Sequence, residues 1–225
     1  MKPETPGQGN PRQTVVHLVR HGEVENPAGL LYGRLPDYHL SDLGREMALA
    51  VAADLRDRDV VHLRCSPLER AQETMAPLAS TLGLPVTTDD RVIEAENQLQ
   101  GLKVTFSALL RNPRSWWLFR NALEPSWGEP YQQIVARMRL ALRDAAAAAA
   151  GHEAVIVSHQ LPIWMARRDA EGRRLFHDPR RRECRLASVT SFRYLDGRLS
   201  SVSYREPAAA LYAPGRKTQK FVAGA

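Results

Sequence analysis

The stretch TVVHLVRHGEVEN, residues 14–26, decides the fold, and its character changes halfway along its length. Residues 14–19 are β-branched or apolar apart from His17, as in a buried strand of a parallel sheet. Arg20 and His21 follow at once, and Gly22 comes next. A core strand that ends in a guanidinium and an imidazole predicts a functional site at its carboxyl end, where open α/β sheets bind their ligands.

The composition fits one α/β domain. The chain has 225 residues, of which 44% are apolar and 25% are charged. No apolar run approaches the roughly 20 residues that span a bilayer, and the first residues contain no apolar signal core, so we expect no membrane partner. Two cysteines are too few for a disulfide framework, and we therefore expect a cytoplasmic protein with reduced thiols.

The formal net charge of +6 reflects an excess of arginine, with a local run at residues 180–182. Such a charge suggests either a nucleic-acid partner or a solvated surface combined with a site for a small anion. The sequence has no basic stretch interleaved with aromatic residues, no zinc-ligand spacing and no basic helix. We therefore do not expect nucleic acid as a partner, and we favour a small anion.

Strand and helix patterns alternate, which predicts an α/β fold of three layers, with a mostly parallel central sheet and helices on both faces. The expected strands are 15–19, 60–65, 154–158, 188–195 and 199–204. Asp196 and Gly197 predict a hairpin between the last two. The expected helices are 42–57, 68–82 and 131–150. Pro77 is expected to kink the second helix or to end it early.

The predicted boundaries divide the chain into one domain and two terminal segments. We expect a disordered lead-in at 1–13, a domain at 14–206 and a flexible tail at 207–225. Residues 96–130 contain three tryptophans and little periodicity, and they are interpreted as an insertion or lid. The oligomeric state stays open; a homodimer formed through the 188–204 edge is one alternative.

Basic and imidazole side chains recur at three predicted strand ends. Arg20 and His21 follow the first strand, Arg70 lies in the motif CSPLERAQET after the second, and His159 follows the strand at 154–158. Because the carboxyl ends of parallel strands meet at one edge, we expect these four side chains to converge. Forked guanidinium donors and nearby helix N-termini suit a dianionic phosphoryl group. Each residue alone has an ordinary structural explanation, but their recurrence at three strand ends does not.

Four motifs together resemble the histidine phosphatase superfamily, also called the phosphoglycerate mutase-like family. They are LVRHGE at 18–23, LSDLGREMA at 40–48, CSPLERAQET at 65–74 and VIVSHQ at 155–160. They occur in the order expected for that family, and the resemblance covers about residues 15–204. The segments SHQLPIW and WGEPY, with the alanine and arginine bias, resemble an actinobacterial-type branch.

The resemblance implies a mechanism for the basic cluster. His21 would be the nucleophile and would form a phosphohistidine, since a neutral imidazole attacks without a strong base. Arg20, Arg70 and His159 would stabilise the charge on the equatorial oxygens. Water would then cleave the P–N bond, with no metal and no cofactor.

The resemblance also implies a carboxylic acid that protonates the leaving oxygen. In DRVIEAENQLQG this acid is Glu94, with Val92 in place of the usual leucine. Glu96 is the competing candidate, two residues further along. A carboxyl buried beside the site would have a raised pKa, which suits a general acid.

Five further positions are implied less directly. The resemblance gives Asn26 and Gln160 as phosphate-side residues, although Asn26 is one residue early and Gln160 replaces a common glycine. Glu23, Gly33 and Arg34 are weaker candidates on the substrate side.

The sequence therefore predicts a metal-independent phosphomonoester hydrolase that acts on a small phosphorylated metabolite. The alternatives are a phosphoglycerate mutase and a non-catalytic relative that binds a phosphorylated ligand. The motifs do not identify the substrate.

Overall fold

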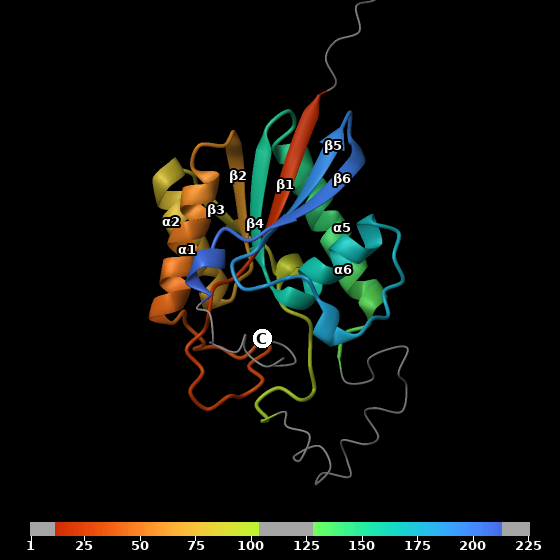
Figure 1. Cartoon of the computed structure of the whole chain (residues 1–225). Helices are drawn as coiled ribbons and strands as arrows, with labels where there is room; N and C mark the ends of the chain where they lie inside the picture. The colour runs from red at the N-terminus through yellow and green to blue at the C-terminus, as the bar shows by residue number, and fades with distance from the viewer. Residues whose placement is uncertain (1–11, 104–127, 213–225) are drawn as a thin grey trace, which may run out of the picture.

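The computed structural model describes residues 12–103 and 128–212. Most of the predicted lead-in, tail and insertion lies outside these residues. The central sheet has six strands in the order β3-β2-β4-β1-β5-β6 (Figure 1). The strands are β1 (Gln13–Arg20), β2 (Val60–Cys65), β3 (Val86–Thr88), β4 (Glu153–Ser158), β5 (Val189–Leu195) and β6 (Arg198–Arg205).

The sheet is mixed, with its parallel part next to an antiparallel hairpin. β3, β2, β4 and β1 pair in parallel, whereas β5 pairs antiparallel with both β1 and β6. The predicted hairpin turn is present, and Asp196 and Gly197 have positive φ values of 48° and 76°, as a two-residue hairpin turn requires. The α/β class predicted from the sequence is confirmed. The three residues of β3 were not predicted as a strand.

Helices cover both faces of the sheet, which gives the three predicted layers (Figure 1). α1 (Asp42–Leu55) and α2 (Glu69–Leu82) lie on one side, and α5 (Tyr131–Ala148) and α6 (Gln160–Ala170) lie on the other. Short 3-10 helices are η1 (Asp90–Val92), η2 (Pro179–Arg181) and η3 (Ala209–Leu211). α6 was not predicted. The expected early end at Pro77 is wrong, because α2 continues to Leu82 and ends at Gly83, whose φ is 65°.

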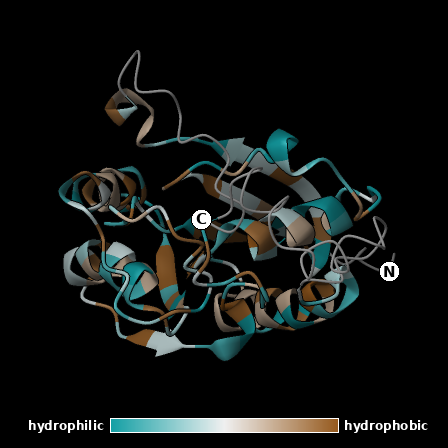
Figure 2. Ribbon diagram, turned by 90° about the horizontal axis from the view of Figure 1, so that it is seen from below, coloured by the Kyte–Doolittle hydropathy of each residue, from teal (hydrophilic) through white to brown (hydrophobic). Residues whose placement is uncertain are grey.

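Neighbouring residues of the central strands point into two different cores. Val16 and Leu18 of β1 pack with α5 and α6, whereas Val19 packs with α1 and α2. This arrangement explains the nearly continuous apolar run in β1, since a parallel strand is buried on both faces. The hydropathy colouring shows hydrophobic residues on the strands between the two helical layers (Figure 2).

His17, the polar residue in that run, is fully buried and has two partners. Its Nδ1 lies 2.7 Å from the Ser191 hydroxyl, and its Nε2 lies 2.8 Å from a Glu153 carboxylate oxygen. A buried imidazole is tolerated when its nitrogens are paired in this way.

The described residues that follow β6 pack against the domain. Residues 207–212 continue the domain through η3, and Ala208 is buried in the core beside α1 and α2. The Tyr212 hydroxyl donates a hydrogen bond to the Leu186 carbonyl. Residues 207–212, which the sequence analysis assigned to the tail, thus pack against the rest of the domain.

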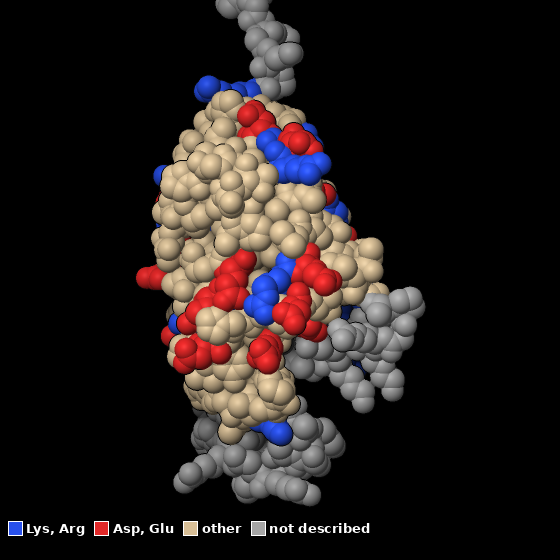
Figure 3. Space-filling model, turned by 90° about the vertical axis from the view of Figure 1, so that its left-hand side faces the viewer, with Lys and Arg blue, Asp and Glu red and all other residues tan. Residues whose placement is uncertain are grey.

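The surface charge and the length of the helices are relevant to two partners, nucleic acid and a membrane. The face on the side of α1 and α2 carries acidic and basic side chains close together in its lower half (Figure 3). On this face, the described residues form no continuous basic surface. Among the helices of residues 12–103 and 128–212, none is long and apolar enough to cross a membrane.

The start of α1 packs directly against the chain that follows β1. The Ser41 hydroxyl accepts a hydrogen bond from the Gly44 amide at 3.0 Å and donates one to the Glu23 carboxylate at 2.7 Å. A Cβ added at Gly44 would lie 2.0 Å from the Glu23 carbonyl oxygen. Glycine is therefore required here, and the close approach fixes the chain that carries Arg20 and His21.

We predict that Gly44→Ala destabilises the protein. Alanine would favour the helix by about 1 kcal/mol, but the clash with backbone is expected to outweigh this, for a net loss of about 1–3 kcal/mol. Urea denaturation measures the difference. Glu46→Ala, on the exposed side of the same helix, is the control and should change stability by less than about 0.5 kcal/mol. A Gly44→Ala variant as stable as the wild type would contradict this packing.

Candidate active site

The register of the parallel strands brings the three predicted strand ends together. Arg20 of β1 is paired with Ser158 of β4. The His21 amide donates to the Ser158 carbonyl at 3.1 Å, and the Ser66 amide donates to the Val157 carbonyl at 3.0 Å. These ends lie at the lower edge of the sheet in Figure 1, the edge that Figure 2 views from below. The residues that follow β1, β2 and β4 are therefore neighbours.

His21 is fully buried, and its two nitrogens have different surroundings. Nδ1 lies 2.8 Å from the Gly22 carbonyl oxygen, to which it must donate. Nε2 has no hydrogen-bond partner among the described residues. Burial, together with Arg70 and Arg20, holds the pKa of His21 well below its usual range. The imidazole is therefore neutral at pH 7, with its lone pair on Nε2.

His159 lies beside His21, with 5.1 Å between the ring centroids. Its Nε2 is 2.7 Å from the Ser66 hydroxyl, and its Nδ1 has no partner among residues 12–103 and 128–212. His159 is also the N-cap residue of α6. Burial and the nearby Arg70 lower its pKa well below the usual value.

Arg20 and Arg70 are buried beside the two histidines. The Nη1 of Arg20 donates to the Cys184 carbonyl at 2.8 Å, and the Nη2 of Arg70 donates to the Gly33 carbonyl at 2.6 Å. The Nε and Nη1 of Arg70 have no partner among the described residues. We call Arg20, His21, Arg70 and His159 the His–Arg cluster. Its positive charge and available N–H groups suit an oxyanion with several oxygens.

Glu94 and Glu96 lie in very different surroundings. Glu94 is 3% exposed, and burial raises its pKa even though Arg70 and Arg20 act in the opposite direction. The Glu96 side chain is 71% exposed and forms an ion pair with Arg34. A buried carboxyl with a raised pKa beside the His–Arg cluster is suited to general acid catalysis, so the geometry favours Glu94.

An ion-pair network fixes the backbone on both sides of Glu94. The Glu129 carboxylate accepts from Arg137 Nε at 2.7 Å and from Arg34 Nη2 at 3.1 Å. Arg137 also donates to the Ile93 carbonyl at 2.8 Å, and Arg34 Nε donates to the Glu94 carbonyl at 2.6 Å. No motif or pattern in the sequence indicated Arg137. Each guanidinium nitrogen of Arg34 has a protein partner, so Arg34 holds this segment in position.

The structure places the other weakly predicted residues around the cluster. Asn26 uses its amide within its own loop: Nδ2 donates to the Leu30 carbonyl at 2.8 Å, and Oδ1 accepts from the Leu30 amide at 3.1 Å. Both polar atoms of its side chain thus take part in the fold of this loop. Gly33 has a φ of 44° and binds Arg70 through its carbonyl. Glu23 binds the cap of α1, and Gln160 begins α6.

Two residues of the motif CSPLERAQET were not assigned roles from the sequence. Ser66 binds His159, as described above. The Thr74 hydroxyl accepts from the Gly22 amide at 3.0 Å and donates to the Arg70 carbonyl at 2.6 Å. Thr74 thus connects the chain after β1 to α2. Their positions within a motif that also contains Arg70 were the only available signal.

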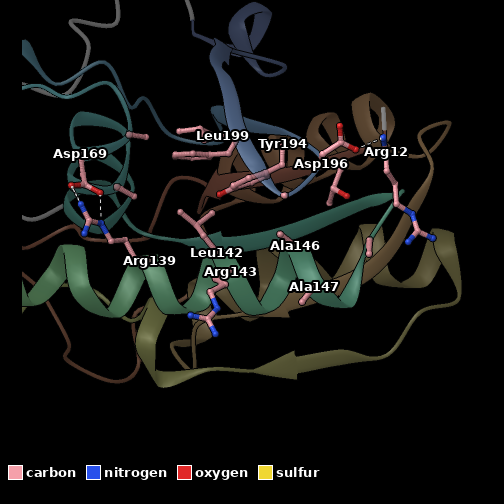
Figure 4. A pocket seen from close by; sticks show the side chains of 16 residues that line it. Arg12, Arg139, Leu142, Arg143, Ala146, Ala147, Asp169, Tyr194, Asp196 and Leu199 are labelled. Atoms are coloured by element: carbon pink, nitrogen blue, oxygen red, sulfur yellow. Dashed lines mark hydrogen bonds and ion pairs between the residues drawn. The ribbon is translucent and has the colours of Figure 1, made fainter. Parts of the chain in front are cut away.

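A separate cavity of about 660 Å³ lies between α5, α6 and the β5–β6 hairpin (Figure 4). Small side chains leave this space open: Ala146, Ala147, Ala150, Ala166 and Ala170 line it. An ion pair of Arg139 with Asp169, 2.6 Å long, lies at one end of it. No residue of the His–Arg cluster lines this cavity. In the part of the chain that the structure describes, no three His, Cys, Asp or Glu residues are grouped to hold a metal ion.

The chain is similar to known proteins along most of its length. A model of the histidine phosphatase superfamily (branch 1) matches residues 16–207. The chain belongs to the histidine phosphatase superfamily. The match includes every residue of the His–Arg cluster and Glu94.

Three proteins illustrate what the chain is similar to. The uncharacterized protein Rv0525 of Mycobacterium tuberculosis is 54% identical over 200 residues, covering 88% of this chain and 99% of the relative. Phosphoserine phosphatase 1 of Hydrogenobacter thermophilus is 29% identical over 150 residues, covering 65% of this chain and 71% of that protein. The structure of mycobacterial glucosyl-3-phosphoglycerate phosphatase matches with a TM-score of 0.68 and 26% identity, covering 86% of this chain and 97% of that chain.

We predict that the stability of this histidine phosphatase falls as the pH drops below about 6.5. Burial lowers the pKa of His17, His21, His159 and His177. The unfolded chain therefore binds protons that the folded protein excludes, and acid favours unfolding by about 1.4 kcal/mol per pH unit for each such imidazole. Urea denaturation between pH 5 and 7 measures the slope.

His21→Asn should reduce this slope, because the unfolded variant lacks one imidazole that binds a proton when the wild type unfolds. Gln132→Asn, on the surface, removes no titratable group; it is the control and should keep the wild-type slope. The explanation is wrong if the free energy of unfolding does not change between pH 6.5 and 5, or if both variants have the same slope.

Proposed function

We propose that this protein hydrolyses phosphomonoesters of a small metabolite through a phosphohistidine on His21, without a metal ion. One observation carries the proposal: Nε2 of the neutral, buried His21 has no hydrogen-bond partner among the described residues and lies close to the buried guanidinium groups of Arg20 and Arg70. Among the same residues, Nε and Nη1 of Arg70 also have no partner, so they can donate to an anion. The phosphatase relatives support hydrolysis as the reaction. A cytoplasmic location is proposed with it, since Cys65 and Cys184 are both buried and unpaired.

The first step transfers the phosphoryl group to His21. The Nε2 lone pair forms the N–P bond as the bond from phosphorus to the ester oxygen breaks on the opposite side. Arg20, Arg70 and the Nδ1 side of His159 stabilise the charge on the three equatorial oxygens. The departing alkoxide takes the proton of Glu94, which its raised pKa retains near neutral pH.

The second step releases phosphate and restores the enzyme. Water attacks phosphorus while the ionised Glu94 takes its proton, and the N–P bond breaks. The electron pair of that bond returns to Nε2, so His21 is neutral again and Glu94 is protonated. The hydrogen bond from Nδ1 to the Gly22 carbonyl keeps the imidazole in the required orientation in both steps.

We predict that His21→Ala abolishes phosphate release from p-nitrophenyl phosphate. The loss should be about 10³-fold or more, because the residue that forms the covalent intermediate is missing. The assay runs at pH 6–8 with EDTA present throughout, and His152→Ala is the surface control. EDTA-sensitive activity would contradict metal independence. Equal activity of His21→Ala and the wild type would contradict the nucleophile. A well-folded wild type that releases no phosphate but interconverts phosphoglycerates would instead be a mutase.

Substrates with different leaving groups test whether Glu94 is the general acid. Glu94→Gln should lower kcat for an alkyl phosphate by about 10²–10⁴-fold, because alkoxide cannot leave without a proton. The loss should be much smaller for p-nitrophenyl phosphate, whose phenolate leaves unprotonated. Glu96→Gln is the matched control and should show neither effect. Activity on alkyl phosphates should fall as the pH rises through the raised pKa of Glu94, and an equal loss on both substrates would contradict this role.

A further inference from the structure

Arg182 lies next to the His–Arg cluster, although it belongs to the arginine run at 180–182, which is typical of a solvent-exposed surface. It follows η2, and its Nη1 is 3.4 Å from the amide oxygen of Gln160, the residue after His159. The Gln160 amide nitrogen in turn lies 3.4 Å from the Cys184 carbonyl, to which Arg20 also donates. Arg182 is therefore separated from Arg20 by one side chain and one carbonyl.

A neutral histidine fixes the orientation of the Arg182 guanidinium. Arg182 Nε donates to His177 Nε2 at 2.9 Å, and His177 Nδ1 donates to the Leu175 carbonyl at 2.8 Å. Burial lowers the pKa of His177 to about 4, so its Nε2 accepts this hydrogen bond at neutral pH. The His177 ring packs against Tyr131 and Trp164, with centroid distances of 5.7 and 5.9 Å. The guanidinium is thus oriented by a neutral partner, His177, and not by an ion pair with a carboxylate.

Arg182 forms no ion pair with a carboxylate of residues 12–103 and 128–212, and the nearest acidic influence on it is that of the buried Glu94. Arg34 and Arg137, next to Glu94, instead share Glu129. Arg182 is only partly exposed, and burial lowers its pKa. The Tyr131 hydroxyl lies beside it. A partly buried cation that has no ion-paired carboxylate among the described residues is unfavourable, and a ligand anion would supply the missing negative charge.

The number of buried guanidinium groups at the site indicates how many negative charges the ligand carries. Two guanidinium groups, Arg20 and Arg70, match the two charges of a phosphoryl group. Arg182 adds one positive charge, which one carboxylate matches in both charge and forked geometry. Arg180, in the same run, is paired with Asp178, so it does not add a charge for a second phosphate.

We infer that Arg182 and Tyr131 bind a carboxylate of the substrate, so that the preferred substrates are phosphomonoesters of hydroxy acids. The inference rests on the proposed function and extends it from the transferred group to the rest of the substrate. It assigns Arg182 to specificity, while the His–Arg cluster and Glu94 carry out the reaction.

Two probes that differ at one group provide the test. In 3-phosphoglycerate a carboxylate replaces the hydroxymethyl group of glycerol 3-phosphate. The wild type should prefer 3-phosphoglycerate by about 10- to 100-fold in kcat/KM, the range expected for one charge-assisted hydrogen-bonded pair. In Arg182→Met this ratio should fall to about 1, and Arg182→Lys, which keeps the charge but loses the fork, should give an intermediate ratio. Arg181→Met, at the exposed neighbour, should keep the wild-type ratio.

Each other outcome has a definite meaning. A wild-type ratio near 1, or an unchanged ratio in a folded Arg182→Met, overturns the inference. A stronger dependence on Arg182 for 1,3-propanediol bisphosphate than for 3-phosphoglycerate overturns the carboxylate in favour of a second phosphate. The proposed function is tested separately by phosphate release from p-nitrophenyl phosphate. If neither carboxylate nor hydroxymethyl probe is hydrolysed, titration calorimetry with the same two probes measures the ratio of their affinities. This ratio should fall to about 1 in Arg182→Met, and an unchanged ratio overturns the inference.

Discussion

The parallel register between β1 and β4 is the constraint on which the site depends. It sets Arg20 opposite Ser158, so the next residue on each strand, His21 and His159, must be neighbours. A shift of one residue would reverse every side chain of a strand that is buried on both faces, at the cost of both cores. The apolar packing of the sheet therefore also fixes the geometry of the two imidazoles, and rigid strands hold them more accurately than loops would.

Burial then determines the chemistry of the residues brought together. The same exclusion of water lowers the pKa of His21 and raises that of Glu94, so a neutral nucleophile and a protonated acid coexist at neutral pH. Arginines are used in two ways around this pair. Arg34 and Arg137 are neutralised by Glu129 and hold the backbone beside Glu94, whereas Arg70 has no carboxylate partner among the described residues and remains available to an anion.

The sequence predicted what depends on local pattern and motif. The strands β1, β2 and β4 and the residues at their ends could be found, because apolar runs and strand-end polar groups are adjacent in the chain. The choice between Glu94 and Glu96 required the fold, since two residues of similar sequence context differ only in burial. Arg182 could not be distinguished from its neighbours in an arginine run, because its role depends on contacts with distant residues. The short β3 lacked enough residues to show a pattern.

The central claim is that His21 Nε2 carries the phosphoryl group between the two steps. Rapid quenching of the wild type with a ³²P-labelled phosphomonoester, followed by peptide mapping by mass spectrometry under alkaline conditions, tests it most directly. The account predicts a transient, acid-labile phosphate on the peptide that contains His21, absent from His21→Ala. Turnover with no such intermediate at any quench time, or a label on His159 or on a serine, would contradict it.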